Sequence, residues 1–373
     1  MLTFKYRLYP SKEQQSKLWA DANSLNWLYN YFLNQRIETY RETGKGINCY
    51  TQIKELTNLK KTNPFLKTVH SQVLQQVALR LDKSYKQFFR DNKSGTGLPH
   101  FRSCKDFFGI CYPQSGYTIT DNIFLTKRYG SIKFVKHRTL RGNIKQIFIT
   151  TKNNKWYISI ITDYTLPRSK SESQIGIDVG ITNIVATSDG VIIRNKRHTK
   201  YFDKQINNLK SRRDKQCVKR SRRYNFLTST IKRLYDVKSR KTNDFLHKVS
   251  HNLSSNNDTI FCEDLELKSM SESKKTGMNR ELRNSQLSKF ISYLEYKSNC
   301  LIKVNPCNTS KTCNNCGHIM LMPLNIRVYN CPNCNHSEDR DINSAKNILC
   351  LGQAYLNNST VTTLQEALGF NPG

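Results

Sequence analysis

The stretch CNNCGHIMLMPLNIRVYNCPNCNHSEDRDINSA, residues 313–345, contains the pattern that decides the fold. Two Cys-x-x-Cys pairs in it are separated by fourteen residues. Four thiolates at this spacing are typical of a structural zinc ribbon that binds one Zn²⁺ ion. The predicted zinc ligands are Cys313, Cys316, Cys331 and Cys334.

Two acids follow the ribbon directly, and one further cysteine precedes it. Asp339 and Asp341 come just before a helical pattern that we expect to run from about Ile342 to Gly352. The ribbon would fix a carboxylate at this position, which makes both acids candidates for catalysis. Cys307 is close enough in the chain to be an alternative zinc ligand.

The charge of the chain indicates a polyanionic partner. Its 373 residues include 60 Lys and Arg against 28 Asp and Glu, which gives a net charge of +32. In a compact protein, so many positive side chains repel one another, and such a charge is unusual for an enzyme that acts on small metabolites. Nucleic acid is the simplest partner, and a generally basic binding protein is the plainer alternative. The N-terminus has no apolar signal core, so we expect an intracellular protein with no membrane association.

The first half of the chain predicts a helical domain inserted in a β domain. Residues 2–9 alternate as an amphipathic strand, and Ser11 to Gln14 form a capping-box pattern that opens a helix. A second helix is expected over Ser71–Arg90. Residues 100–165 are rich in β-formers with repeated turn signals, which favours a barrel or compact sheet that the opening strand joins.

The second half predicts an α/β domain with acids at the ends of strands. Gln174 begins a strand that carries Asp178, and glycines 176 and 180 on the same face would leave room above this carboxylate. Residues 259–263 form an apolar strand that ends in Glu263, and a helix follows Ser285 as its N-cap. Residues 301–304 form a strand that leads to the ribbon.

Residues 194–248 between these strands form a basic, helical stretch. It holds nineteen Lys and Arg against four Asp, so we expect it to contact the backbone of an RNA or of an RNA–DNA duplex. The candidate contacts in it are Arg212, Arg213, Lys219, Arg220, Arg222 and Arg223.

Asp178, Glu263 and an acid after the ribbon have the arrangement of an RNase H-like nuclease site. Two Mg²⁺ ions about 4 Å apart can clamp the attacking and leaving oxygens of an in-line displacement. Hard cations of this kind need carboxylates from more than one element. Asp264 and Glu266 are alternatives to Glu263, as Asp339 is to Asp341.

These motifs together resemble the TnpB (OrfB) family of insertion-sequence proteins, which are RNA-guided DNA endonucleases. More distantly they resemble compact type V CRISPR effectors and Fanzor proteins. The most specific matches are Gly176-Ile-Asp-Val-Gly-Ile-Thr-Asn183, Glu263-Asp-Leu, Thr309–Gly317, Cys331–Cys334 and Asp339–Ala345. Asn335 departs from the glycine of many family ribbons, but Asn tolerates the left-handed backbone well.

The resemblance implies a multidomain α+β, bilobed protein. A helical recognition domain, 11–92, is inserted in an OB-like β-barrel wedge domain, 1–10 plus 93–167. A split RNase H-like (RuvC) nuclease domain, 174–304 plus 338–373, carries the basic insertion 194–248 and the zinc ribbon 305–337. The protein would be a monomer in a ribonucleoprotein, within the bacterial cytoplasm or nucleoid.

The resemblance also implies an activity and a set of site residues. A guide RNA from the transposon end would pair with double-stranded target DNA beside a short adjacent motif. Asp178, Glu263 and Asp341 would hold two catalytic Mg²⁺ ions, and Asp341 is preferred because it lies two residues before Asn343. Arg340 and Asn343 would support catalysis. The adjacent motif would be read from the helix that contains Ser71, Gln72, Gln75 and Gln76.

Three other functions fit parts of the pattern. An unguided RNase H-fold transposase or resolvase would cut DNA without RNA. A nuclease-inactive repressor would bind nucleic acid only, although the intact acids argue against it. A compact CRISPR effector would have a repeat array beside its gene.

Overall fold

The computed structural model describes residues 1–91, 97–103, 107–166, 172–196, 198–265, 279, 282, 284–323 and 325–367. Within this part of the chain, no helix is long and apolar enough to cross a membrane. The chain divides into two compact units, Met1–Leu166 and Pro167–Gly373. The expected domain boundaries at 92/93, 167 and 373 lie outside the described residues.

The N-terminal unit contains an antiparallel sheet of seven strands, in the order β2-β6-β7-β1-β5-β4-β3. The strands are β1 (Leu2–Tyr9), β2 (Ile110–Tyr112), β3 (Thr118–Thr120), β4 (Ile123–Thr126), β5 (Gly130–Val135), β6 (Ile144–Lys152) and β7 (Lys155–Thr162). The opening strand pairs with β5 and β7, which confirms that it joins this sheet. Tyr112 of β2 and Phe124 of β4 contact each other with ring centroids 6.0 Å apart, so the sheet curls.

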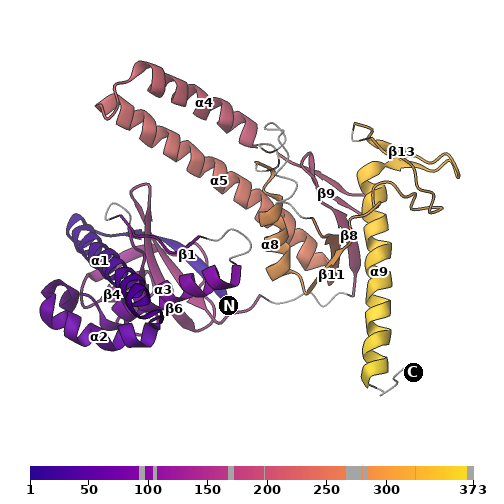
Figure 1. The fold of residues 1–373 in the computed structure, drawn as a ribbon. Helices are drawn as coiled ribbons and strands as arrows, with labels where there is room; N and C mark the ends of the chain where they lie inside the picture. Colours follow the sequence, from indigo (N-terminus) through magenta and orange to yellow (C-terminus); the bar gives the residue numbers. More distant parts are fainter. Residues whose placement is uncertain are drawn as a thin grey trace. The chain divides into compact units, whose positions relative to one another are not determined.

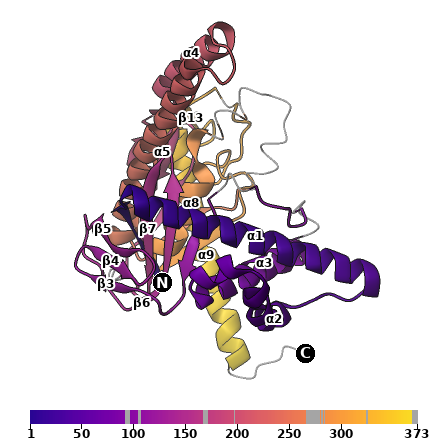
Figure 2. The same ribbon diagram turned by 90° about the vertical axis from the view of Figure 1, so that its left-hand side faces the viewer.

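The described residues of this unit also form four helical segments. They are α1 (Lys12–Thr43), α2 (Cys49–Thr62), the 3-10 helix η1 (Pro64–Thr68) and α3 (Ser71–Asp91). The predicted capping box is confirmed, because the Gln14 amide donates to Ser11 Oγ and the Ser11 amide donates to Gln14 Oε1. The α3 helix packs against both α1 and α2 (Figure 2). Its buried residues, including Val73 and Val77, join one continuous apolar core with the sheet.

The C-terminal unit is built on a mixed sheet of five strands, in the order β10-β9-β8-β11-β12. The strands are β8 (Gln174–Asp178), β9 (Asn183–Thr187), β10 (Ile192–Arg194), β11 (Thr259–Glu263) and β12 (Cys300–Val304). β8, β11 and β12 are parallel to one another, whereas β9 and β10 run antiparallel to their neighbours. The three strands predicted in this half of the chain, from Gln174, over 259–263 and over 301–304, are therefore confirmed.

Helices cover both faces of this sheet (Figure 1). They are α5 (Arg222–Asn256) and α8 (Leu287–Lys297) on one face and α9 (Arg340–Ala367) on the other, whereas α4 (His198–Gln216) packs along α5. Residues alternate along β11, so Ile260 and Cys262 pack with α5 and α8, whereas Phe261 packs with Ile348 of α9. Two short strands, β13 (Val328–Asn330) and β14 (Ser337–Asp339), form a separate hairpin that leads into α9.

Three local predictions were wrong. The final helix does not end at Gly352 but continues to Ala367. Ser285 does not cap α8, because the N-cap is Gln286 in a left-handed conformation and the Ser285 hydroxyl donates to the Leu282 carbonyl. Gly176 does not leave open space, because a Cβ there would lie 2.2 Å from the Ala345 carbonyl oxygen of α9.

Candidate active site and metal centre

Asp178 and Glu263 end two adjacent parallel strands. In the β8–β11 register, Gly176 pairs with Phe261 and Ile177 pairs with Cys262, so the two acids follow at the same edge of the sheet. Alternation along the strands directs both carboxylates to the face that α9 covers. The strand pairing therefore brings together two acids that are 85 residues apart in the sequence.

Asp339 and Asp341 have different roles at the start of α9. Asp339 is the residue before the helix, and its Oδ1 accepts hydrogen bonds from the Asp341 amide at 2.8 Å and the Ile342 amide at 3.4 Å. This is the geometry of an N-cap, in which a side-chain oxygen satisfies the free amides of the first turn. Asp341 lies in the first turn of α9 and does not cap the helix. Of the two candidates, Asp341 is the one whose charge raises the pKa of Asp178.

The electrostatics show that the three acids form one cluster. Burial, followed by the charges of Glu263 and Asp341, raises the pKa of Asp178 to about 8. The hydroxyl of Ser344 and the charge of Arg340 oppose this shift only in part. Burial also raises the pKa of Glu263. Carboxylates that repel one another in a desolvated place favour either protonation or a bound cation.

Polar neighbours orient two of these carboxylates. The Asn183 side-chain amide donates to Asp341 Oδ2 at 2.8 Å, and Arg327 lies 3.6 Å from Asp341 Oδ1. The Thr309 hydroxyl donates to Glu263 Oε1 and lowers its pKa against the effect of burial. Sequence reasoning missed Asn183 and Thr309 as partners, although each stands in a stretch that matches the family.

The alternatives to Glu263 are placed differently. Asp264 is exposed, and its backbone amide continues the ladder by donating to the Val304 carbonyl at 2.8 Å. Glu266 lies outside the described residues. Among the described acids of this segment, Glu263 is therefore the one whose charge raises the pKa of Asp178.

The four predicted cysteines come together as a metal centre. Within the described ranges they are the only set of three or more His, Cys, Asp or Glu side chains whose ligand atoms all lie within 4.8 Å of one another. Cys307, the alternative ligand, is exposed and is not part of this group. Asn335 has φ of 56°, which confirms that it takes the left-handed position after the second pair. Four sulfur ligands in this arrangement are suited to zinc.

Each cysteine pair supplies an asparagine to the other pair. Asn315 Nδ2 donates to Cys334 Sγ, and Asn333 Nδ2 donates to Cys316 Sγ, both at 3.5 Å. These amides are the main reason that the pKa of Cys334 falls to about 6 and that the pKa of Cys316 is lowered. Cysteine binds metal ions as the thiolate. By lowering the pKa of Cys334 and Cys316, the two asparagines favour this form. In the sequence, an Asn directly before the second Cys of each Cys-x-x-Cys motif could have indicated these two contacts.

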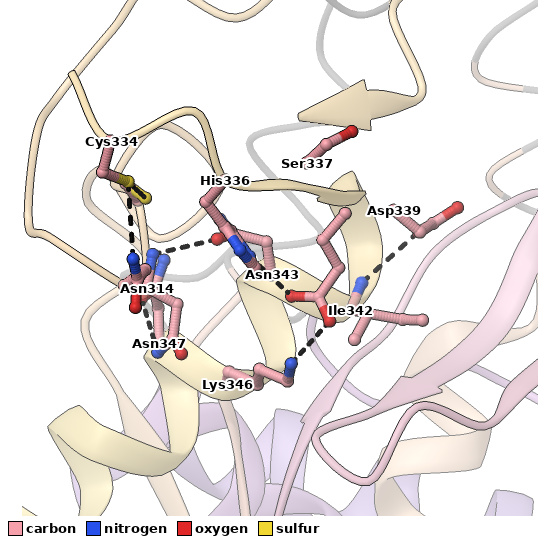
Figure 3. Close-up of polar contacts among 12 residues, drawn as sticks. Asn314, Cys334, His336, Ser337, Asp339, Ile342, Asn343, Lys346 and Asn347 are labelled. Carbon is pink, nitrogen blue, oxygen red and sulfur yellow. Dashed lines mark hydrogen bonds and ion pairs between the residues drawn. The ribbon is translucent and has the colours of Figure 1, made fainter. Parts of the chain in front are cut away.

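The ribbon is attached to α9 by two buried asparagines one turn apart (Figure 3). Asn343 Oδ1 accepts from the Asn314 amide at 2.9 Å, and Asn343 Nδ2 donates to the Thr312 carbonyl at 2.8 Å. Asn347 Nδ2 donates to the same carbonyl at 2.7 Å. Both ends of the Asn343 amide are therefore used within the protein, which gives it a positioning role for the helix that carries Asp341.

Arg340 also contacts the ribbon region. Its guanidinium donates to the Pro323 carbonyl at 3.0 Å and to Ser310 Oγ at 3.4 Å. Its charge still reaches the acidic cluster, because it lowers the pKa of Asp178. The position of Arg340 is thus compatible with the supporting role expected from the sequence.

Most of the predicted base-reading residues on α3 have partners within the N-terminal unit. Ser71 Oγ accepts from Lys60 Nζ at 2.7 Å, Gln72 Oε1 accepts from the Ser115 hydroxyl at 2.9 Å, and Gln76 lies 3.9 Å from the Cys111 thiol. Gln75 is partly exposed. These contacts join α3 to α2, to β2 and to the turn after β2, and they leave fewer free polar groups for a base edge than the sequence suggested.

The predicted basic stretch is a helical hairpin made by α4 and α5 (Figure 1). Phe202 and Ile206 of α4 pack with Ile231 of α5 and hold the helices together. Arg213 pairs with Asp214 and stacks on Tyr224 across the hairpin, at 5.3 Å from the ring centroid. The other five candidate contacts are exposed: Arg212, Lys219, Arg220, Arg222 and Arg223.

The fold and the site define a class of protein: a mixed α+β protein with an acidic cluster at a sheet edge and a four-cysteine metal centre beside it. Three family models match the chain: "Helix-turn-helix domain" of OrfB over residues 1–45, "Probable transposase" of OrfB over 152–274, and "Cas12f1-like, TNB domain" over 288–348. The chain belongs to the TnpB (OrfB) family of insertion-sequence proteins. Within residues 1–45, however, the structure has one strand and one continuous helix, Lys12–Thr43.

Relatives extend over almost the whole chain. A protein of Escherichia coli named "Putative RNA-guided DNA endonuclease InsQ" is 28% identical over 95% of this chain and 92% of its own length. A "Putative RNA-guided DNA endonuclease" of Streptomyces pristinaespiralis is 28% identical over 94% of this chain and 89% of its own. The solved complex of Cas12f1 with sgRNA and target DNA covers 93% of this chain and 98% of its own, at 19% identity. Its TM-score of 0.33 is too low to support an argument.

Proposed function

We propose that this protein is an RNA-guided DNA endonuclease whose cleavage site consists of Asp178, Glu263 and Asp341. The observation that carries the proposal is the coupling of three acids from two parallel strands and one helix, which raises the pKa of Asp178 to about 8. The strand order and strand directions of the five-stranded sheet support an RNase H-like (RuvC) fold for this domain. Family relatives named for this activity support the choice of reaction.

The donor set fits magnesium. Mg²⁺ prefers oxygen ligands and retains several waters, so one or two carboxylates for each ion are sufficient. When bound, the ions would activate water and stabilise the leaving oxygen of a phosphodiester. Asp178, whose pKa responds to both other acids, would hold the ions together with Glu263 and Asp341.

The remaining side chains would position this site. Asn183 orients Asp341, and Thr309 orients Glu263. The ribbon, holding one structural Zn²⁺ ion, would fix the start of α9 through Asn343 and Asn347. Its role in the proposal is support of the catalytic acid.

The nucleic-acid partners are a guide RNA and a double-stranded DNA target in a bacterial cell. The exposed cations of the α4–α5 hairpin would contact the phosphate backbone, and base pairing would supply the sequence information. The N-terminal unit, with its helices set on a curled sheet, would serve as recognition and wedge domains that read a short motif beside the target. The protein would act as a monomer within a ribonucleoprotein.

Copurification and reprogramming test the proposal. The protein is expressed together with the DNA that flanks its gene, and the bound RNA is sequenced. We expect one discrete RNA, and we expect Mg²⁺-dependent cutting of a plasmid only when that plasmid matches the guide. Cutting that is independent of the RNA sequence would refute guidance.

An unguided transposase-type nuclease is the second candidate, favoured by the description of the family model that matches residues 152–274. It requires the same acids but no RNA. Cutting by RNA-free protein in Mg²⁺ would support it, whereas strict dependence on added guide RNA would exclude it.

A further inference from the structure

The turn between α4 and α5 exposes two apolar side chains that the hairpin core does not bury. Val218 is 80% exposed and Phe226 is 68% exposed. Leu227, the neighbour of Phe226, is buried, so the helix directs Phe226 away from the α4 side. A single exposed apolar residue is ordinary in proteins. The surroundings of Phe226 therefore decide whether it has a function.

The surroundings are strongly basic. Residues 215–235 contain seven Lys and Arg and no Asp or Glu. Three of the four acids elsewhere on the hairpin pair locally: Asp203 with Lys238, Asp214 with Arg213 and Asp244 with Lys248. An aromatic side chain in a segment rich in cations and without an acid of its own is complementary to nucleic acid, which offers both flat bases and phosphates.

The turn is ordered by its own hydrogen bonds. Asn225 Nδ2 donates to the Arg220 carbonyl at 3.1 Å, and the Tyr224 amide donates to Ser221 Oγ at 3.2 Å as an N-cap contact. Arg220 has φ of 70°, a left-handed conformation that Gly or Asn would adopt at lower cost. Strain of this kind marks positions where a particular side chain is required.

Cations flank Phe226 along one face of α5. Arg222 precedes it by four residues and Arg233 follows it by seven, so the three side chains share a helical face. At 1.5 Å per residue, Arg222 lies about 6 Å before Phe226 along the axis and Arg233 about 10 Å after it. Both arginines are exposed.

We propose that the tip of the α4–α5 hairpin binds an unpaired stretch of nucleic acid, with Phe226 stacked on a base and Arg222 and Arg233 bound to flanking phosphates. A fully paired duplex presents its phosphates but keeps its base faces covered. Phe226 should therefore contribute to the binding of unpaired nucleic acid and not to the binding of a duplex. The inference rests on the proposed function only in taking the ligand of the basic hairpin to be nucleic acid. The inference goes beyond the proposed function because it names Phe226 as the side chain that binds an unpaired base.

Binding by the full-length Asp178→Ala protein tests the inference, because no cleavage is then expected to interfere. Fluorescence anisotropy gives the Kd for a labelled oligothymidylate and for a blunt duplex of equal length, at one salt concentration. Stacking of one base on an aromatic ring corresponds to a change in Kd of about 5- to 100-fold. We expect Phe226→Ala to weaken oligothymidylate binding within this range and to leave the Kd for the duplex unchanged.

Two further variants separate stacking from other causes. Phe226→Trp should retain the affinity, whereas Phe226→Leu, which is apolar but not aromatic, should behave like Phe226→Ala. Tyr201→Ala is the matched control, since Tyr201 is 65% exposed near the other end of the hairpin. Full affinity in Phe226→Leu, an equal loss for the duplex, an equal loss in Tyr201→Ala, or no loss in Phe226→Ala would each overturn the inference. A failure of guided cleavage alone would count against the proposed function and not against this site.

Discussion

Replacement of Gly176 by alanine probes the contact that sets the position of α9. The added Cβ would lie 2.2 Å from the Ala345 carbonyl oxygen and 2.7 Å from the Leu349 amide nitrogen. Ordinary contact begins near 3.4 Å, so the helix backbone must retreat by about 1.2 Å. Neither of these backbone atoms can rotate away as a flexible side chain would.

The expected magnitudes follow from this displacement. Overpacking of a core costs about 1–3 kcal/mol, and a clash with backbone atoms belongs at the upper end. For a unit of this size, a loss of 3 kcal/mol lowers the Tm by about 6–12 °C. Ala345 is one turn from Asp341, so the acid moves with the helix, and a shift of about 1 Å can reduce the rate of cleavage about 100-fold.

Thermal unfolding and a guided cleavage assay measure both effects. Gly46→Ala is the control, because a Cβ at Gly46 has nothing within 4 Å and its backbone is not left-handed. We expect the control to match the unmodified protein within about 0.5 kcal/mol. The reasoning would be refuted by a Gly176→Ala protein that unfolds at the original temperature and cuts at the original rate.

The remaining predictions concern the metal centre and the acids. Cys316→Ser should lower the zinc content and the stability, and full zinc occupancy in this variant, measured by atomic absorption, would contradict the four-cysteine assignment. Asp339→Ala should weaken only the helix cap, by about 1 kcal/mol, and retain cleavage, whereas Asp341→Ala should abolish cleavage; equal loss of cleavage in both would contradict the division of roles. In metal-free protein the pKa of Asp178 is raised to about 8, above its value of about 4 in an unfolded chain, so its contribution to stability should fall as the pH rises from about 4 to about 8. Asp178→Asn should flatten this decline in urea titrations at a series of pH values, and an unchanged decline would exclude Asp178 as its source.

Local patterns were sufficient to predict most elements around the site. Alternation identified strand 174–178, and an apolar run that ends in an acid identified strand 259–263. The cysteine spacing predicted the metal centre, because four ligands in two short turns are a local feature of the chain.

Contacts that depend on packing could not be predicted in this way. Gly352 resembles a helix stop in sequence, but in the structure it lets α9 approach the ring of Phe261, with which a Cβ would collide at 2.0 Å. Gly176 has the same role on the strand. The pairing of Asn343 with the ribbon backbone and of Thr309 with Glu263 joins segments whose distance in space no spacing rule reveals.

The central claim is that Asp178 acts in cleavage and not in binding. The most direct measurement compares the unmodified ribonucleoprotein with Asp178→Ala, both assembled with the same guide RNA, on a matching plasmid in Mg²⁺. The account predicts that Asp178→Ala retains its RNA and binds the target with the original affinity but does not cut it. Cutting by the purified variant at the original rate would contradict the account and would place the catalytic centre elsewhere in the molecule.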